Sequence, residues 1–280
     1  MSTQETATVP SQADKAELFR ALHEGPEPLL LPNPWDAGSA KLLASLGFAA
    51  LATTSSGFAA TLGRLDGSVT REEALGHAAL VAAATSLPVS ADLENAFADE
   101  PDGVAETIRM AVQAGLAGCS VEDFTGQPGS PIYDIGLATD RVAAAAAAAQ
   151  AGLVRLVVTA RAENYLHGLP DLADTITRLQ AYQEAGADVL YAPGLTSLDE
   201  VRQVVREVDL PVNVLAMRGG PTVSELASAG VRRVSVGGAF AFAALGALVE
   251  AARELREQGT YGYLERAAVG RSAVGAAFGG

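Results

Sequence analysis

The stretch Pro88-Val89-Ser90-Ala91-Asp92-Leu93-Glu94-Asn95 begins as an apolar run behind a proline and ends in two carboxylates. A start of this kind is typical of a buried parallel strand. Side chains two residues apart on a strand point to the same side, which predicts that Asp92 and Glu94 lie together. Two like charges on one side repel each other unless a cation lies between them or water screens them.

A second apolar run with an acidic end comes later in the chain. Gly118-Cys119-Ser120-Val121 leads directly into Glu122 and Asp123. Carboxylates at the ends of two apolar strands favour a hard divalent cation bound through oxygen, Mg²⁺ or Mn²⁺. The alternative is that these carboxylates cap the next helices or face solvent.

Apolar runs and helical patterns alternate along the rest of the sequence. Eight short strands are predicted, each followed by a helix, and this count is the signature of a (β/α)₈ TIM barrel. An open doubly wound sheet is the competing α/β fold, but it often carries a Gly-rich dinucleotide turn, and the sequence has no G-x-G-x-x-G or Walker motif. The predicted strands are 29–31, 48–54, 88–92, 117–121, 153–159, 187–191, 211–215 and 232–236.

The pattern contains no internal linker, so we predict a single domain with extra terminal helices. Residues 1–12 are rich in Ser, Thr, Gln and Pro, which predicts a disordered tail. The barrel domain is expected to span 13–268 and to end in a helix at 239–257 and a final helix around 261–268. The Gly- and Ala-rich residues 269–280 are expected to form a flexible tail.

Composition limits the classes of partner. The formal charge of −14 argues against nucleic acid and against an anionic membrane surface, although a small anionic substrate needs only one arginine in its pocket. The single cysteine, Cys119, excludes an intrachain disulfide framework. The N-terminal residues lack a basic region followed by a long apolar core, so a cytoplasmic location is expected.

In a TIM barrel the active site lies at the C-terminal ends of the strands. Acidic residues follow the third and fourth predicted strands, and Arg161 follows the fifth. This sorting of charge predicts a metal site beside a guanidinium that recognises a carboxylate or a phosphate.

Six separated motifs occur in consistent order between about residues 15 and 250. Together they resemble the isocitrate lyase / phosphoenolpyruvate mutase superfamily. The motifs are Asn33-Pro34-Trp35-Asp36-Ala37-Gly38-Ser39-Ala40, Ala52-Thr53-Thr54-Ser55-Ser56-Gly57, Ala91-Asp92-Leu93-Glu94, Val121-Glu122-Asp123, Ala160-Arg161 and Glu184-Ala185-Gly186-Ala187-Asp188.

The resemblance implies a Mg²⁺-dependent enzyme that acts on an α-keto or α-hydroxy acid through a metal-held enolate. It also implies roles for individual residues. A D-x-D pair that holds Mg²⁺ in the family matches Asp92, with Glu94 in place of the second aspartate. The implied positions are Glu122 near the metal, Asp66 in the loop after the second strand, Arg161 on substrate oxygens, and Ser56, Gly57 and Phe58 as backbone donors to the substrate carboxylate.

The loop 125–136 departs from the family pattern. Lyase members carry a K-K-C-G-H type motif there, and mutase members carry Lys and Asn-Ser, but this loop holds no Lys, Cys or His. Tyr133 is a candidate general acid from the loop, and packing is its alternative role. His167 is a candidate acid near the predicted mouth. Asn213 is a candidate substrate contact, with a structural hydrogen bond as the alternative.

The leading functional hypothesis is a Mg²⁺-dependent lyase that cleaves a C–C bond in a small 2-oxo- or 2-hydroxy-dicarboxylate. The first alternative is P–C bond chemistry on phosphonopyruvate, as a mutase or a hydrolase. The second is a metabolite-binding relative that kept the metal pocket and lost catalysis. Because family members often exchange their last helices between subunits, a homodimer or homotetramer is expected.

Overall fold

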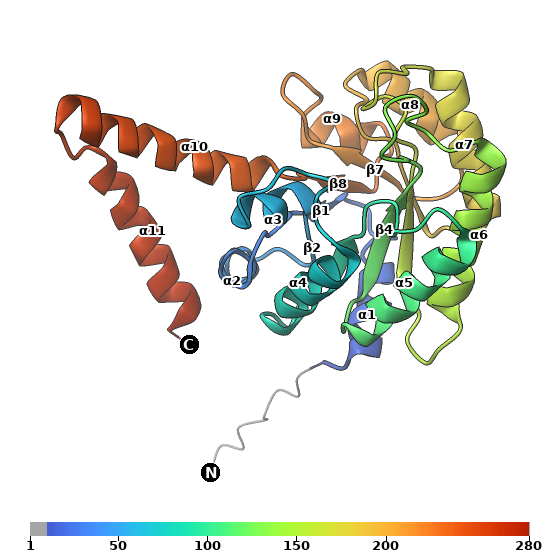
Figure 1. Cartoon of the computed structure of the whole chain (residues 1–280), viewed down its shortest axis with the longest axis horizontal. Coiled ribbons are helices and arrows are strands. Elements are labelled where there is room, and N and C mark those ends of the chain that lie inside the picture. Colours follow the sequence, from blue (N-terminus) through green and yellow to red (C-terminus); the bar gives the residue numbers. More distant parts are fainter. Residues whose placement is uncertain (1–9, 280) are drawn as a thin grey trace, which may run out of the picture.

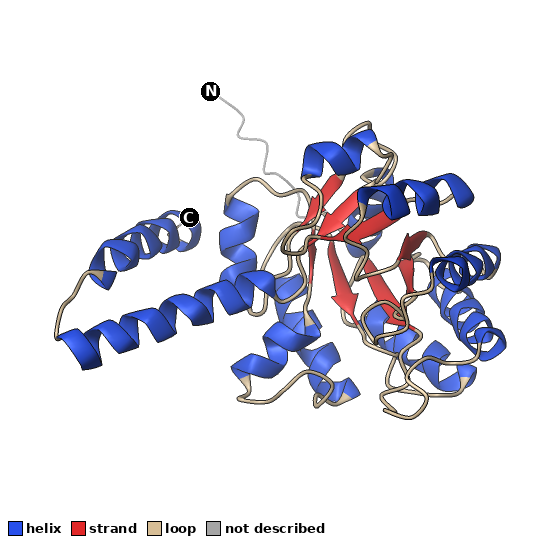
Figure 2. Cartoon of the chain, turned by 90° about the horizontal axis from the view of Figure 1, so that it is seen from above, coloured by secondary structure: helices blue, strands red, loops and turns tan. Residues whose placement is uncertain are grey.

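The computed structural model describes residues 10–279. Eight parallel strands form one sheet in the order β1-β8-β7-β6-β5-β4-β3-β2, which curls into a nearly closed barrel with helices outside it (Figures 1 and 2). The predicted (β/α)₈ fold is therefore confirmed. The strands are β1 (Leu29–Leu31), β2 (Leu51–Ala52), β3 (Val89–Asp92), β4 (Gly118–Glu122), β5 (Val157–Arg161), β6 (Val189–Tyr191), β7 (Val212–Leu215) and β8 (Arg233–Ser235).

The helices connect successive strands and cover the sheet. Thr70 and Glu73 form the capping box that opens α4, in which each side chain bonds the other residue's backbone N–H. The helices are α1 (Gln12–Ala21), α2 (Ala37–Ser45), α3 (Ser55–Thr61), α4 (Arg71–Ala83), α5 (Pro101–Gln113), α6 (Ile135–Gln150), α7 (Leu172–Glu184), α8 (Leu198–Glu207), α9 (Val223–Ser228), α10 (Ala239–Arg253) and α11 (Tyr263–Phe278), with a π-helical turn at Glu254–Gln258.

The barrel closes between β1 and β2 through contacts just beyond the strands. The Ala52 N–H donates to the Pro32 carbonyl over 3.1 Å. The Asn33 side-chain amide donates to the Thr53 carbonyl over 2.9 Å. Asn33 Oδ1 also accepts the N–H groups of Val236 and Gly237 beyond β8. One buried asparagine therefore joins the first, second and last strands at the edge where the active site is expected.

Helix α1 plugs the opposite, N-terminal end of the barrel. Phe19 is fully buried there with the side chains that begin several strands. A Cβ atom on Gly118 would lie 2.7 Å from the Phe19 ring and 2.8 Å from the Val157 carbonyl oxygen, so only glycine fits at this position. With one end filled by α1, a ligand has access from the other end.

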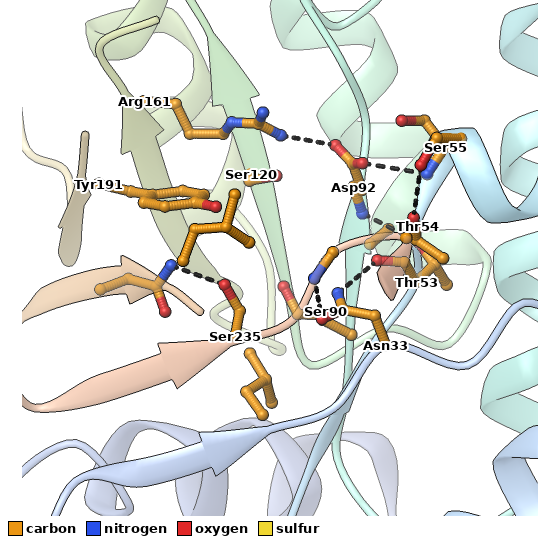
Figure 3. Close-up of a pocket in the computed structure, with 18 of the residues that line it drawn as sticks. Asn33, Thr53, Thr54, Ser55, Ser90, Asp92, Ser120, Arg161, Tyr191 and Ser235 are labelled. Carbon is orange, nitrogen blue, oxygen red and sulfur yellow. Dashed lines mark hydrogen bonds and ion pairs between the residues drawn. The ribbon is translucent and has the colours of Figure 1, made fainter. Parts of the chain in front are cut away.

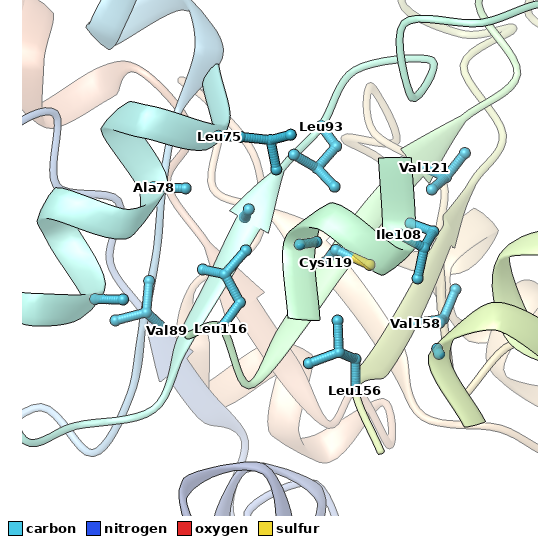
Figure 4. Close-up of a cluster of buried hydrophobic side chains, with 14 of the residues drawn as sticks. Leu75, Ala78, Val89, Leu93, Ile108, Leu116, Cys119, Val121, Leu156 and Val158 are labelled. Carbon is cyan, nitrogen blue, oxygen red and sulfur yellow. The ribbon is translucent and has the colours of Figure 1, made fainter. Parts of the chain in front are cut away.

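The largest core cluster lies between the sheet and helices α4 and α5 (Figure 4). Cys119 is fully buried in it beside Ile108 and Leu116, where it serves as a small core residue. Burial raises the pKa of the Cys119 thiol to about 12, so the sulfur stays protonated and unreactive at neutral pH.

Two predicted strands are longer than the observed ones. Strand β2 covers only Leu51–Ala52 of the predicted 48–54, and helix α3 begins at Ser55, where the Thr54 hydroxyl accepts the Gly57 N–H. Strand β5 begins at Val157, and Leu153 is fully exposed in the loop before it. The apolar run 153–159 predicted that Leu153 belongs to the strand. Leu153 lies outside the hydrogen-bonded part of the sheet and is therefore exposed to solvent.

The C-terminal helices extend further than the sequence predicted. Helix α11 runs from Tyr263 to Phe278, although residues 269–280 were expected to be a flexible tail. Its small residues allow helical propagation, and its last residue lies against α2, with the Lys41 ammonium 5.8 Å from the Phe278 ring centroid. Most of the tail predicted at 1–12 lies outside the described residues, but Gln12 already belongs to α1, which Ser11 caps.

Helices α10 and α11 project away from the barrel as an arm (Figures 1 and 2). The arm carries many exposed apolar side chains: Phe240, Phe242, Leu245, Leu248, Val249, Leu255, Tyr261, Leu264, Val269, Val274 and Phe278. Among the described helices, none combines the length and apolar character that crossing a membrane requires.

Candidate active site

A cavity of about 180 Å³ opens at the C-terminal ends of the strands (Figure 3). A cavity of this size suits a small acid of a few carbon atoms. Its polar lining comes from all eight strands or the residues that follow them, together with Asp66 from the loop after α3. These residues are Asn33, Thr53, Thr54, Ser55, Ser56, Asp66, Ser90, Asp92, Ser120, Arg161, Tyr191, Asn213, Arg233 and Ser235.

Arg161, the last residue of β5, is the centre of the charge network. Its guanidinium contacts three carboxylates: Nη1 lies 2.9 Å from Asp92 Oδ1, Nη2 lies 3.1 Å from Glu122 Oε2, and Nε lies 2.7 Å from Glu163 Oε1. The arginine side chain is 13% exposed, and burial of the pairs strengthens each interaction. Despite burial, the three neighbouring carboxylates hold the pKa of Arg161 well above its ordinary value. The guanidinium is therefore fixed in position and permanently charged.

The sequence predicted that the acidic strand ends lie beside Arg161. The structure shows direct contact, because Arg161 lies between Asp92 and Glu122 and contacts both. The register of the sheet explains the contact, since β4 lies beside β5 and pairs Glu122 with Arg161. Parallel neighbours bring their last residues to the same edge. The adjacency itself confirms that the acidic strand ends and the arginine meet at one place.

Asp92, the last residue of β3, is held through both its side chain and its backbone. Its Oδ2 accepts the Ser55 N–H over 3.0 Å, and its own N–H donates to the Thr53 hydroxyl over 2.9 Å (Figure 3). The Arg161 guanidinium contacts the other carboxylate oxygen, Oδ1, over 2.9 Å. Asp92 thus has a fixed orientation beside the cavity.

Glu94 lies near Asp92 for a different reason from the one predicted. Strand β3 ends at Asp92, and Glu94 has a φ of +49° in the turn that follows, so the two-residue strand period does not place it. The two side chains instead share a small pocket behind the main cavity. Burial, with the charges of Asp92 and Asp66 adding to it, raises the pKa of Glu94 to about 7.

The remaining acidic residues also show the effect of burial. Burial raises the pKa of Asp66, a hydrogen bond from Ser55 opposes this rise, and the charge of Asp92 adds to it. Burial raises the pKa of Glu122 and of Glu163, while the Arg161 charge opposes both rises. The five carboxyl groups near Arg161 outnumber its single positive charge, so the site could accept a further cation. These groups are those of Asp66, Asp92, Glu94, Glu122 and Glu163.

The chemistry of this donor set fits a divalent cation, although the predicted ligands Asp92, Glu94, Glu122 and Asp66 do not form a cluster of three or more around one point. Within residues 10–279 no three His, Cys, Asp or Glu side chains are gathered so as to hold a metal ion. Mg²⁺ is commonly bound through one or two carboxylates while water and substrate oxygens complete its shell. The excess of buried carboxylates around Asp92 matches that mode of binding.

The predicted backbone donors to a substrate carboxylate are largely engaged within the protein. The Gly57 N–H donates to the Thr54 hydroxyl, and the Phe58 N–H donates to the Thr54 carbonyl. Of the three residues Ser56, Gly57 and Phe58, only Ser56 lines the main cavity. The Phe58 ring instead stacks on His77 at 4.0 Å between centroids.

Tyr133 and His167 do not line the cavity. The Tyr133 hydroxyl donates to Asp99, and the Arg141 guanidinium lies 4.2 Å from the centre of the Tyr133 ring. The Tyr133 side chain therefore packs between α6 and the loop after β3. His167 stacks on Phe124 at 3.7 Å, with its Nε2 3.8 Å from Glu163 Oε2. These contacts favour a packing role for Tyr133 and place His167 behind Glu163.

Asn213 lines the cavity and also forms structural bonds. Its side-chain amide donates to Ser235 Oγ over 3.0 Å, and its Oδ1 accepts from Arg233 Nε over 2.9 Å. Sequence reasoning gave no role to Glu163, the third partner of Arg161, or to Arg233. The inward alternation of β8 could have indicated Arg233, and the two-residue spacing from Arg161 could have indicated Glu163.

A model of the phosphoenolpyruvate phosphomutase family matches residues 19–256. The chain belongs to the isocitrate lyase / phosphoenolpyruvate mutase superfamily. This confirms the resemblance that the motifs indicated.

Individual members of the superfamily align over most of the chain. The chain is 55% identical to a Burkholderia cenocepacia protein assigned as a lyase or mutase, whose crystal structure superposes with a TM-score of 0.89 over 91% of this chain and 92% of that one. It is 30% identical to the oxaloacetate decarboxylase of Chromohalobacter salexigens over 89% of this chain and 88% of that protein. A phosphonopyruvate hydrolase in complex with oxalate and Mg²⁺ is 25% identical, with a TM-score of 0.79 and 88% coverage of both chains.

Proposed function

We propose that this protein is a Mg²⁺-dependent lyase that cleaves a C–C bond in a small 2-oxo- or 2-hydroxy-dicarboxylate through an enolate. The observation that carries the proposal is the Arg161 guanidinium held among Asp92, Glu122 and Glu163 at the mouth of a small polar cavity. The similarity to an oxaloacetate decarboxylase supports C–C cleavage, and the similarity to a hydrolase crystallised with oxalate and Mg²⁺ supports the metal.

Arg161 would stabilise the negative charge that develops on a substrate oxygen. Its guanidinium carries five N–H donors; Nε and Nη1 each donate one hydrogen bond, to Glu163 and Asp92, and Nη2 forms an ion pair with Glu122. At least two donors remain for substrate oxygens. Because the three carboxylates fix the guanidinium before the substrate arrives, little reorganisation is needed as charge develops.

Asp92 would hold Mg²⁺, and Glu94 and Glu122 would contribute through water. When bound, Mg²⁺ supplies a Lewis acid that stabilises negative charge on oxygen. Ser55 supports Asp92 by donating its N–H, which keeps the carboxylate oriented toward the cavity. Ser56 on the cavity wall would orient a substrate carboxylate through its hydroxyl group.

P–C bond chemistry on phosphonopyruvate is the second candidate, because the matching family model is that of a phosphomutase. The loop 125–136 matches neither classical pattern, since it lacks the lysine of the mutase pattern and the K-K-C-G-H type motif of the lyase pattern. Conversion of phosphonopyruvate to phosphoenolpyruvate, or to pyruvate and inorganic phosphate, at a rate above that for any dicarboxylate would favour this candidate over the lyase.

Replacing Asp92 by alanine tests the proposed function. Turnover of oxaloacetate and of 2-hydroxy-dicarboxylates, followed by NMR, should require Mg²⁺ and stop with a chelator. Asp92→Ala should lower kcat/KM by about 10²–10³-fold, and it should abolish the Mg²⁺-dependent binding of oxalate measured by calorimetry. Tyr133→Phe is the matched control, since the Tyr133 hydroxyl bonds Asp99 outside the cavity, and its turnover should stay within about twofold of wild type.

Two outcomes would contradict parts of this proposal. Unchanged Mg²⁺-dependent oxalate binding in Asp92→Ala would remove the metal assignment. Tight Mg²⁺-dependent binding by the wild type without turnover of any tested acid would instead favour a metabolite-binding relative.

We also propose that the arm formed by α10 and α11 packs on a second copy of the chain in a homodimer or homotetramer. The row of apolar side chains exposed along the arm supports this, because monomeric proteins rarely expose so many together. Light scattering should give a mass of two or four chains. A monomer at micromolar concentration would contradict it.

A further inference from the structure

The floor of the cavity contains a second arginine whose contacts differ from those of Arg161. Arg233, on β8, is 4% exposed and lines the cavity. Its Nε donates to Asn213 Oδ1 over 2.9 Å, its Nη2 donates to the Thr159 hydroxyl over 3.0 Å, and its Nη1 lies 3.3 Å from His23 Nε2. All of these partners are uncharged when His23 is neutral.

His23 is kept neutral by its surroundings. Its Nδ1 lies 2.7 Å from the Phe19 carbonyl oxygen, which can only accept, so Nδ1 carries the proton and Nε2 accepts from Arg233. Burial, with the charge of Arg233 adding to it, lowers the pKa of His23 to about 3. The histidine therefore supports the guanidinium without adding charge.

Across residues 10–279, no carboxylate lies within ion-pair distance of Arg233, whereas Arg161 contacts three. A buried charge without a counter-ion is costly, and proteins usually pair it. Three of the five guanidinium N–H donors are engaged, which leaves two for another acceptor. The cavity thus has an acidic mouth around Asp92 and a positively charged floor.

We propose that Arg233 is a specificity-determining residue that binds the second carboxylate of the substrate at the cavity floor. This inference rests on the proposed function and deepens it, because it explains why a dicarboxylate would be preferred over a monocarboxylate. The reacting end of the acid would lie at the mouth beside Arg161 and Asp92. The distal carboxylate would replace the counter-ion that the folded chain does not supply to Arg233.

A merely structural role for Arg233 is the competing explanation. Its bonds tie β8 to β5, β7 and α1, and its charge also lies across the cavity from the carboxylates at the mouth. In that case the loss of Arg233 would weaken every ligand of the cavity equally. A pair of ligands that differ only in the distal charge separates the two explanations.

The experiment compares malate with its 4-monoamide, which keeps the size and shape and lacks the second charge. Binding is measured by calorimetry with Mg²⁺ present. Wild type should bind malate at least about 10-fold more tightly than the amide, as expected for a charge-assisted hydrogen bond. Arg233→Met should bind the two ligands about equally, with an affinity for the amide within about threefold of wild type. Arg233→Lys should keep part of the preference, and Arg109→Met, on the exposed surface, should keep all of it.

Several results would overturn the inference. Equal binding of malate and the amide by the wild type would do so without any variant, so a misfolded Arg233→Met does not prevent the test. An equal loss of both ligands in a folded Arg233→Met or Arg233→Lys would show a structural role only. If neither acid binds the wild type, the proposed function fails as well, whereas a failure of the inference alone leaves the Mg²⁺ dependence and the Asp92→Ala effect intact.

Discussion

Arg161→Met should lower kcat/KM by about 10²–10³-fold and the free energy of unfolding by about 3–5 kcal/mol. Methionine keeps much of the length of the side chain and removes the charge. Asp92, Glu122 and Glu163 then lose the cation that each contacts, and they remain largely buried. Steady-state kinetics and urea denaturation would measure the two effects.

The stability loss in Arg161→Met should depend on pH with a defined sign. Burial already raises the pKa of Glu122 and of Glu163 above the ordinary value of 4.5, and removing the opposing Arg161 charge raises both further. Between the ordinary pKa of 4.5 and the raised pKa of the folded state, the folded state holds protons that the unfolded state has released. The free energy of unfolding therefore falls as the pH rises through this range. The deficit relative to wild type should be larger at pH 8 than at pH 5.

Arg109→Met provides the matched control for this substitution. Arg109 pairs with Glu106 on an exposed helix face, so its loss should leave both turnover and stability nearly unchanged. Arg161→Lys restores one charge but cannot reach three carboxylates at once, and it should stay well below wild type in kcat/KM. Full activity in Arg161→Lys, or a stability deficit that does not change with pH, would contradict the assigned role.

Arg141→Met should lower the free energy of unfolding by about 3–5 kcal/mol, although Arg141 lies outside the cavity lining. Its buried guanidinium donates to the carbonyls of Asn95, Ala98 and Asp99 and lies over the Tyr133 ring. Each carbonyl that loses its donor without reaching water costs about 1–3 kcal/mol.

The same substitution should loosen the turn that follows β3. Glu94, Ala96 and Phe97 have φ angles of +49°, +59° and +55°, a region that side-chain-bearing residues occupy only when the surroundings impose it. Without Arg141 the turn should open, and hydrogen exchange of residues 94–99 should speed up. Because Glu94 lies beside Asp92, turnover should fall as well.

Arg202→Met, on the exposed face of α8, is the control for Arg141→Met, and its stability should match wild type. A loss below about 1 kcal/mol in Arg141→Met would mean that water replaces the guanidinium at the three carbonyls. Unchanged exchange of residues 94–99 would show that the positive φ angles do not depend on Arg141.

The sequence by itself determined the barrel and the set of residues that meet at its mouth. Strand and helix periods are local properties, and parallel strands place their ends at one edge, so Asp92, Glu122 and Arg161 could be brought together from spacing alone. The absence of Lys, Cys and His from the loop 125–136 was also readable directly.

The tertiary structure alone decided how those residues are paired. Glu94 is placed by a turn with positive φ, Tyr133 is turned away toward Asp99, and the helix α11 continues to Phe278 beside α2. Glu163 completes the pairing of Arg161, while Arg233 receives only neutral partners. Charge balance in a buried site depends on distances between strands that are far apart in sequence, and a local pattern carries no information about those distances.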